Sequence, residues 1–114
     1  MELIVKQKNL PLGHSLREYV TGHMEASLHE FADRIRRVTV CLADINGPRG
    51  GVDKRCNIAV HLARGGTVRA GHTNTQFIAA IYFATDRAAQ AIKRRLGRRR
   101  KRARQKRAWQ LDAD

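Results

Sequence analysis

CNIAVHLARGGTVRAGH, residues 56–72, holds two short apolar runs on either side of a Gly-Gly pair. Along both runs apolar residues alternate with polar or small ones, which is typical of strands that bury one face. Gly65 and Gly66 give the backbone the freedom that a tight hairpin turn needs. The stretch therefore predicts two antiparallel strands, whose inward-facing residues are Cys56, Ile58, Val60 and Leu62 in the first and Val68 and Ala70 in the second.

Two stretches upstream also have the composition of strands. ELIVKQ (2–7) is short and rich in β-branched residues, and VTVCLA (38–43) alternates, with Val38, Val40 and Leu42 on one face. Between the second and third expected strands, DINGPRGGVD (44–53) consists of turn-forming residues. The last three strands should therefore be consecutive antiparallel neighbours.

Two segments show helical spacing instead, with apolar residues at steps of three and four. The first begins near Ser15, the expected N-cap, with Glu18 three residues later as in a capping box, and spans about five turns. The second begins after Thr73, Asn74 or Thr75, any of which could cap it. The apolar stripes are Leu16, Tyr19, Val20, Met24, Leu28 and Phe31 in the first helix and Ile78, Ile81, Thr85, Ala88, Ile92 and Leu96 in the second.

The order β-α-β-β-β-α predicts an α+β fold, a two-layer sandwich with a four-stranded mixed sheet and two helices on one face. A right-handed crossover through the first helix makes the first strand parallel to the second. The chain of 114 residues is long enough for one small domain, which we assign to residues 1–96, with a basic C-terminal tail at 97–114.

Positive charge is concentrated near the C-terminus. The formal net charge is +13, and KRRLGRRRKRARQKR (93–107) holds eleven Lys or Arg residues and no acid. Such a run predicts a polyanionic partner, and mutual repulsion should keep the tail frayed until that partner binds. Arg87, Arg94, Arg98 and Lys101 are separated by 7, 4 and 3 residues, so they form a basic ridge opposite the apolar stripe.

Nucleic acid is the polyanion that the pattern favours. No apolar segment approaches the ~20 residues of a membrane span, and the basic run lacks interleaved apolar side chains that would insert into a bilayer. Without a helix-turn-helix, zinc-finger or heptad pattern, RNA is favoured over DNA. The N-terminus does not have the features of a signal peptide, so we expect a cytoplasmic protein with reduced cysteines, Cys41 facing outward and Cys56 inward.

An enzymatic function is not expected. The five histidines and two cysteines lack metal-ligand spacing, and the sequence has no phosphate-binding GKS/T loop, so no metal, cofactor, catalytic residue or small-molecule substrate is predicted. Cys41 and His61 could share the outer face of the sheet. Asp44 and Asp53 bracket the Gly-rich loop, where turn stabilisation is the simpler role. An RNA-cleaving enzyme that uses Asp44, Asp53 or His61 remains the third hypothesis.

Four motifs in this order resemble the bacterial ribosome hibernation-promoting factors, also called ribosome-associated inhibitors or subunit-interface proteins, in their short form. The resemblance covers about residues 2–96. The motifs are LREYV (16–20), NGPRGG-x-DK-x-C (46–56), the Gly65-Gly66 turn and FIAAIYFATDRAAQAI (77–92).

The resemblance implies a translation inhibitor that docks on the small ribosomal subunit, in the channel for messenger RNA and the A- and P-site transfer RNAs. Such a protein stabilises inactive ribosomes under stress or in stationary phase, has the ribosomal RNA as its partner, and is expected to be a monomer off the ribosome. At first-helix positions where the family often has Lys or Arg, this chain has His23, Ala26 and His29. The family pattern carries over to Arg17, Arg87, Lys93, Arg94 and Arg95, to which we add Arg49, Arg98 and Lys101 from the loop and the ridge.

The alternative is a sequence-nonspecific RNA- or DNA-binding protein that acts through its basic tail alone. In that case the folded domain would contribute little to binding.

Overall fold

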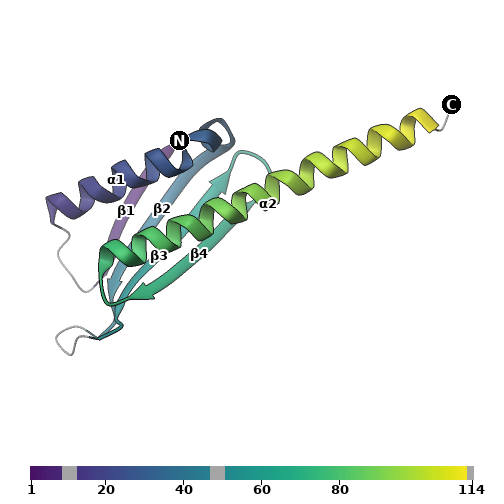
Figure 1. Ribbon diagram of the computed structural model, residues 1–114. Helices are drawn as coiled ribbons and strands as arrows, with labels where there is room; N and C mark the ends of the chain where they lie inside the picture. The colour runs from purple at the N-terminus through teal and green to yellow at the C-terminus, as the bar shows by residue number, and fades with distance from the viewer. Residues whose placement is uncertain (9–12, 47–50, 113–114) are drawn as a thin grey trace.

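The computed structural model describes the backbone of residues 1–8, 13–46 and 51–112, and the side chains of these ranges except 98–103 and 106–112. The elements follow one another in the expected order (Figure 1). They are β1 (Glu2–Lys8), α1 (His14–Leu28), the 3-10 helix η1 (His29–Arg34), β2 (Ile35–Asp44), β3 (Lys54–Leu62), β4 (Thr67–Asn74) and α2 (Phe77–Asp112).

The strands form one sheet in the order β1-β2-β3-β4. β1 runs parallel to β2, with Val5 opposite Val40, and the β2–β3 and β3–β4 pairs are antiparallel. Both helices cover the same face (Figure 1). Gly65 and Gly66 have φ angles of 102° and 83°, in the left-handed region that the hairpin turn requires. The predicted α+β two-layer fold is therefore confirmed.

The core lies between the helices and the inner face of the sheet. The predicted inward residues of β2 and β3 are all buried, as is Val68 on β4, and Ala70 packs against them. Cys56 is buried and Cys41 half-buried, and both are free thiols, as the strand alternation predicted. On α2 the fully buried alanines Ala80, Ala84 and Ala88 face this core, and their small side chains let the helix lie close to the sheet.

Three details of the predicted helices were wrong. Gly13, not Ser15, is the N-cap of α1, and Glu18 pairs with His14 at 2.8 Å instead of closing a capping box. α1 ends at Leu28, and Phe31 is buried from η1, because the chain tightens into a 3-10 helix before β2. Ile78 is 57% exposed, because its side of the first turn of α2 is not covered by another element.

α2 extends well beyond the sheet (Figure 1). Its last buried residue is Leu96, yet the backbone is helical to Asp112, and at 1.5 Å per residue this extension is about 24 Å long. The helical backbone of this segment agrees with the strong helix propensity of Arg, Lys, Gln and Ala, and fraying of the tail before a partner binds stays a prediction. The division into a domain and a tail at residue 97 stays a prediction.

Candidate nucleic-acid interface

The predicted phosphate-binding residues are distributed over α1 and α2. Arg17, Arg87, Lys93 and Arg94 are exposed, and Arg95 is half-buried. Arg49 lies outside the described residues, and Arg98 and Lys101 belong to the stretch of α2 that is described by its backbone only. α2 as a whole carries twelve Lys or Arg residues and two Asp residues, which makes it the most positive element of the fold.

Two of these arginines also hold the fold together. Arg87 Nη1 donates a hydrogen bond to the carbonyl oxygen of Gly71 on β4 at 3.0 Å. Arg95 Nη1 donates to the carbonyl oxygen of Gly65 in the β3–β4 turn. Each guanidinium has five N–H donors, so one bond to a carbonyl leaves others for a phosphate. These two side chains are therefore oriented along the β4 side of α2 before any ligand binds.

The remaining cations on the helices are held weakly. Lys93 Nζ lies 4.0 Å from Glu30 Oε1, and both side chains are more than half exposed, at 52% and 63%. A surface pair of this kind contributes little and is screened by salt. Among the described residues, no hydrogen bond or ion pair engages the side chain of Arg17 or Arg94. These three cations can therefore turn to an external anion at little cost.

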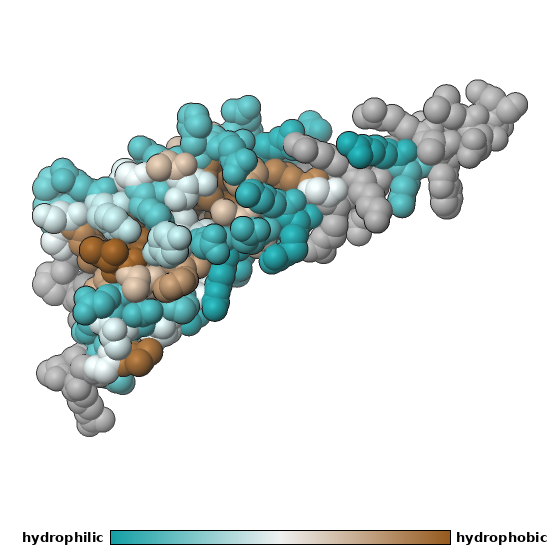
Figure 2. Space-filling view, in the orientation of Figure 1, coloured by the Kyte–Doolittle hydropathy of each residue, from teal (hydrophilic) through white to brown (hydrophobic). Residues whose placement is uncertain are grey.

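Aromatic side chains at the N-terminal end of α2 were missed by the sequence reasoning. Tyr82 and Phe83 are 55% and 45% exposed, and together with Ile78 they make an exposed patch of aromatic and aliphatic side chains. Figure 2 shows hydrophobic surface, in brown, at the start of α2. On α1, His23 stacks on Tyr19 with ring centroids 5.5 Å apart and lies 6.0 Å from Tyr82. The signal was the run FIAAIYFA (77–84), which is apolar on all sides of a helix.

His23 should make stability depend on pH. Desolvation at its half-buried place lowers the pKa of His23 below the ordinary value of 6.5. The unfolded chain therefore binds a proton at His23 more readily than the folded protein does. The folded state keeps its full stability above pH ~6.5 and loses part of it as the pH falls from ~6.5 toward the pKa of His23 in the folded protein. We expect the Tm of the wild type to fall relative to that of His23→Leu between about pH 7.5 and pH 5.5. A proton NMR titration of His23 with a midpoint at or above 6.5 would contradict this.

The acids that bracket the Gly-rich loop form a structural ion cluster. Lys54 Nζ donates to Asp44 Oδ2 at 3.0 Å and to Asp53 Oδ2 at 3.3 Å, while Asp53 Oδ1 lies 3.2 Å away without hydrogen-bond geometry. The hydrogen bond to Asp44, with that to Asp53, raises the pKa of Lys54. The Lys54 ammonium also lies 5.8 Å from the Phe77 ring centroid. The cluster joins the β2–β3 connection to the start of α2.

This geometry does not support the RNA-cleaving hypothesis. His61 lies near the other end of β3, on the outer face of the sheet, where its Nδ1 is 3.1 Å from the hydroxyl of Thr67. Asp44 and Asp53 instead converge on Lys54. Among the described residues, no three His, Cys, Asp or Glu side chains are placed to hold a metal ion. In the same part of the chain, no helix is long and apolar enough to cross a membrane.

Two solved structures have a similar fold. The N-terminal domain of Protein Y from Thermus thermophilus is 29% identical, with a TM-score of 0.69, and the match covers 82% of this chain and 98% of that domain. A ribosomal subunit interface protein from Coxiella burnetii is 19% identical, with a TM-score of 0.65, over 84% of this chain and 99% of the other. No curated protein matches the sequence.

The sequence itself matches a family model over most of its length. Residues 3–101 fit the model described as sigma 54 modulation protein / S30EA ribosomal protein. The match begins in β1 and ends in α2, so it includes the whole α/β sandwich. The resemblance to ribosome hibernation factors is thus confirmed, and the chain belongs to the sigma 54 modulation protein / S30EA ribosomal protein family of ribosome-associated proteins.

Proposed function

We propose that this protein docks on the small ribosomal subunit, in the channel that messenger RNA and the A- and P-site transfer RNAs use. There it blocks translation and keeps ribosomes inactive in stressed or stationary-phase bacterial cells. It is a cytoplasmic protein and a monomer when it is off the ribosome. Family membership supports ribosome association, and the similar protein from Coxiella burnetii is described as a subunit interface protein.

One observation carries the assignment of the docking surface. Arg17 on α1 and Arg94 on α2 are exposed and unengaged among the described residues, and they belong to the helical layer whose second helix carries twelve cations. Cations on this layer bind phosphates without reading sequence, which suits a fixed RNA-lined channel. The contacts would come from Arg17, Arg49, Arg87, Lys93, Arg94, Arg95, Arg98 and Lys101.

The mechanism that we propose requires no chemical step. Arg87 and Arg95 are oriented in advance by their bonds to backbone carbonyls, so little side-chain entropy is lost when their remaining N–H groups meet phosphates. Lys93 would exchange its weak pairing with Glu30 for a phosphate. Occupation of the channel by the sandwich would then exclude messenger and transfer RNA sterically.

Sedimentation through sucrose gradients tests this proposal directly. At ~50 mM salt the protein should travel with purified small subunits, and if six or more phosphates are contacted its affinity should fall by ~10³ or more by ~200 mM salt. Excess transfer RNA bound in the P site should displace it. A protein that stays at the top of the gradient at low salt, or whose binding ignores both salt and transfer RNA, would contradict the proposal.

A further inference from the structure

The face of the sheet opposite the helices is also positively charged. On β1, Leu3 and Val5 pack on the core, so Lys6 and Lys8 lie on the opposite face. The register then places Arg37, Arg55 and Arg69 of the other strands on that face too. Among the described strand residues, this outer face carries these five cations and one acid, Glu2. No helix covers this face in the described part of the chain (Figure 1).

Arg55 is held in one orientation on this face. Its Nε donates to Asn57 Oδ1 at 3.0 Å, and its Nη1 donates to the Thr73 hydroxyl at 3.0 Å. The guanidinium lies over Gly71, where a Cβ would come within 2.5 Å of Nη2 and 2.7 Å of Asn57 Oδ1. Only glycine leaves this space open. Two donors are thus used inside the protein, and the others of the fork remain for a ligand.

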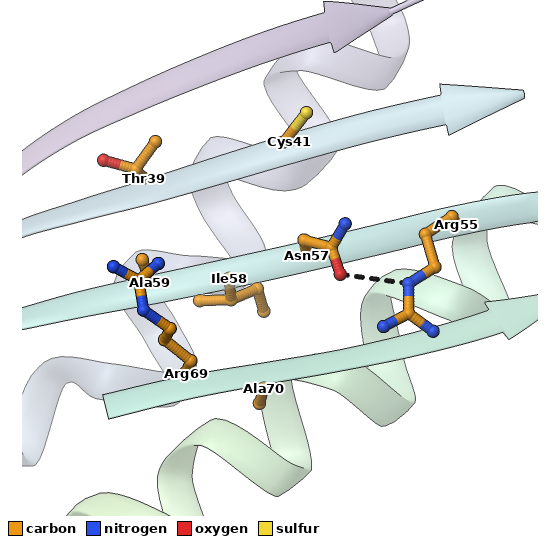
Figure 3. Close-up of a pocket in the computed structure, with 8 residues that line it drawn as sticks. All are labelled: Thr39, Cys41, Arg55, Asn57, Ile58, Ala59, Arg69 and Ala70. Carbon is orange, nitrogen blue, oxygen red and sulfur yellow. Dashed lines mark hydrogen bonds between the residues drawn. The ribbon is translucent and has the colours of Figure 1, made fainter. Parts of the chain in front are cut away.

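A shallow depression of about 490 Å³ lies beside this arginine. Figure 3 shows Arg55 on one side of it and Arg69 on the other, with Thr39 and Cys41 of β2 along its border. Because Asn57 Oδ1 accepts the bond from Arg55, the Asn57 amide nitrogen points away from Arg55 toward β2 (Figure 3). The depression therefore has a guanidinium group at each end, four strand residues or about 13 Å apart, with the Asn57 amide N–H₂ and the Thr39 hydroxyl along it. Such donors suit more than one oxyanion of a chain.

We propose that this depression binds the phosphate backbone of single-stranded RNA, with Arg55 and Arg69 on different phosphates, as a site separate from the helical layer. The charge around it favours a polymer of phosphates over a single acid. Lys8 and Arg55 share a cross-strand row with Ala43 between them, so they lie two strand spacings, about 10 Å, apart, and Lys6 is in the row of Cys41 at the border of the depression.

The RNA at this site is bound without base recognition. The outward residues of the described strands include no Phe, Tyr or Trp on which bases could stack, so contacts are made to the backbone. The protein then carries RNA-binding surfaces on both of its layers. This site does not depend on the proposed docking of the helices, because it lies on the opposite face of the sheet.

Cys41 provides a local reporter for the experiment. It borders the depression and is half-buried, whereas Cys56 is fully buried and its burial raises the pKa of the thiol to about 12. The full-length protein is treated with N-ethylmaleimide, with and without an oligouridylate of about twelve nucleotides. At an RNA concentration about ten times the Kd, alkylation of Cys41 should slow about tenfold. Cys56 should stay unmodified throughout, which verifies that the core is folded.

Variants distinguish RNA binding at this depression from attraction by the overall positive charge of the protein. Arg55→Gln combined with Arg69→Gln should abolish the protection of Cys41. The control variant, Arg34→Gln with Arg64→Gln, removes the same amount of charge from exposed arginines away from the depression. In this variant RNA should still protect Cys41 from alkylation. Gly71→Ala retains every charge but displaces the Arg55 guanidinium, so it should reduce protection as well.

Three outcomes would overturn the proposal. In the first, fluorescence anisotropy shows that RNA binds the protein, yet Cys41 is alkylated as fast as without RNA. The second is equal protection in the wild type and in the Arg55/Arg69 double variant. The third is protection by polyglutamate as strong as by RNA, which would assign the depression to an acidic protein partner instead.

Discussion

A protein that lacks residues 97–114 is expected to bind small ribosomal subunits on the order of 100-fold more weakly at about 150 mM salt. The deletion removes eight Lys or Arg residues that extend from the end of the core along the projecting part of α2. Two of the eight proposed contact residues, Arg98 and Lys101, are lost, together with six further cations of the projecting helix. With a salt slope of about 0.9 per phosphate, each contact is worth about fivefold at ~150 mM relative to ~1 M salt, so the loss of two to three contacts has an effect of this size. The slope of log K against log salt should also become shallower. Binding of fluorescently labelled protein at several salt concentrations measures both.

The same deletion separates the two nucleic-acid hypotheses. Under the proposed function, the shortened protein still competes with transfer RNA, because the cations of residues 1–96 remain. If binding and competition both disappear, the tail alone is the binding element, and if nothing changes, the tail is not part of the interface. The Tm should be preserved, since the last buried residue is Leu96. Gly97→Pro is the matched control: it breaks the helix but keeps every cation, so it should retain most of the affinity.

Met24→Ala is expected to lower the free energy of unfolding by about 2–5 kcal/mol, the largest stability effect among these predictions. Met24 is fully buried on α1, and its sulfur lies 3.8 Å from the Thr85 hydroxyl of α2, which itself donates to the Ile81 carbonyl. Truncation leaves a cavity where the two helices meet above the sheet. Urea unfolding, followed by circular dichroism, should show a lower midpoint with the same slope.

Ile78→Ala is the matched control for that experiment. Ile78 is apolar and belongs to α2, but it is 57% exposed, so its removal should change stability by no more than about 0.5 kcal/mol. Equal losses in the two variants would mean that Ile78 is covered in solution. A Met24→Ala protein as stable as the wild type would show that the contact between α1 and α2 adds little to the core.

The strands could be predicted from the sequence because their alternation has one interpretation. Once Val60 faces the core, Cys56 on the same strand must face it, and once Val40 faces the core, its neighbour Cys41 must not, since side chains alternate strictly along a strand. Helical spacing is less informative. It identifies one side of α2, but not how far the neighbouring elements extend over that side, and so Ile78 was assigned to the core.

The candidate site was predictable in its charge but not in its contacts. The basic residues of α2 were evident in the sequence, whereas the bonds of Arg87 and Arg95 to carbonyls of β4 and its turn depend on tertiary packing. The clamped Arg55 was also out of reach, because Asn57 is its neighbour along the strand but Thr73 and Gly71 come from the next one. Interactions of this kind join residues distant in sequence, and no local pattern encodes them.

The hydrogen bond from Arg87 of α2 to β4 also affects self-association. A sheet edge with free carbonyl and N–H groups can recruit a strand from a second molecule and start aggregation. β1 and β4 are the edges of this sheet. Arg87 occupies the Gly71 carbonyl on β4, and β1 carries Lys6 and Lys8, whose charges repel an identical strand. Both edges thus carry a feature that opposes the addition of a second strand, which disfavours polymerisation of the protein through its sheet.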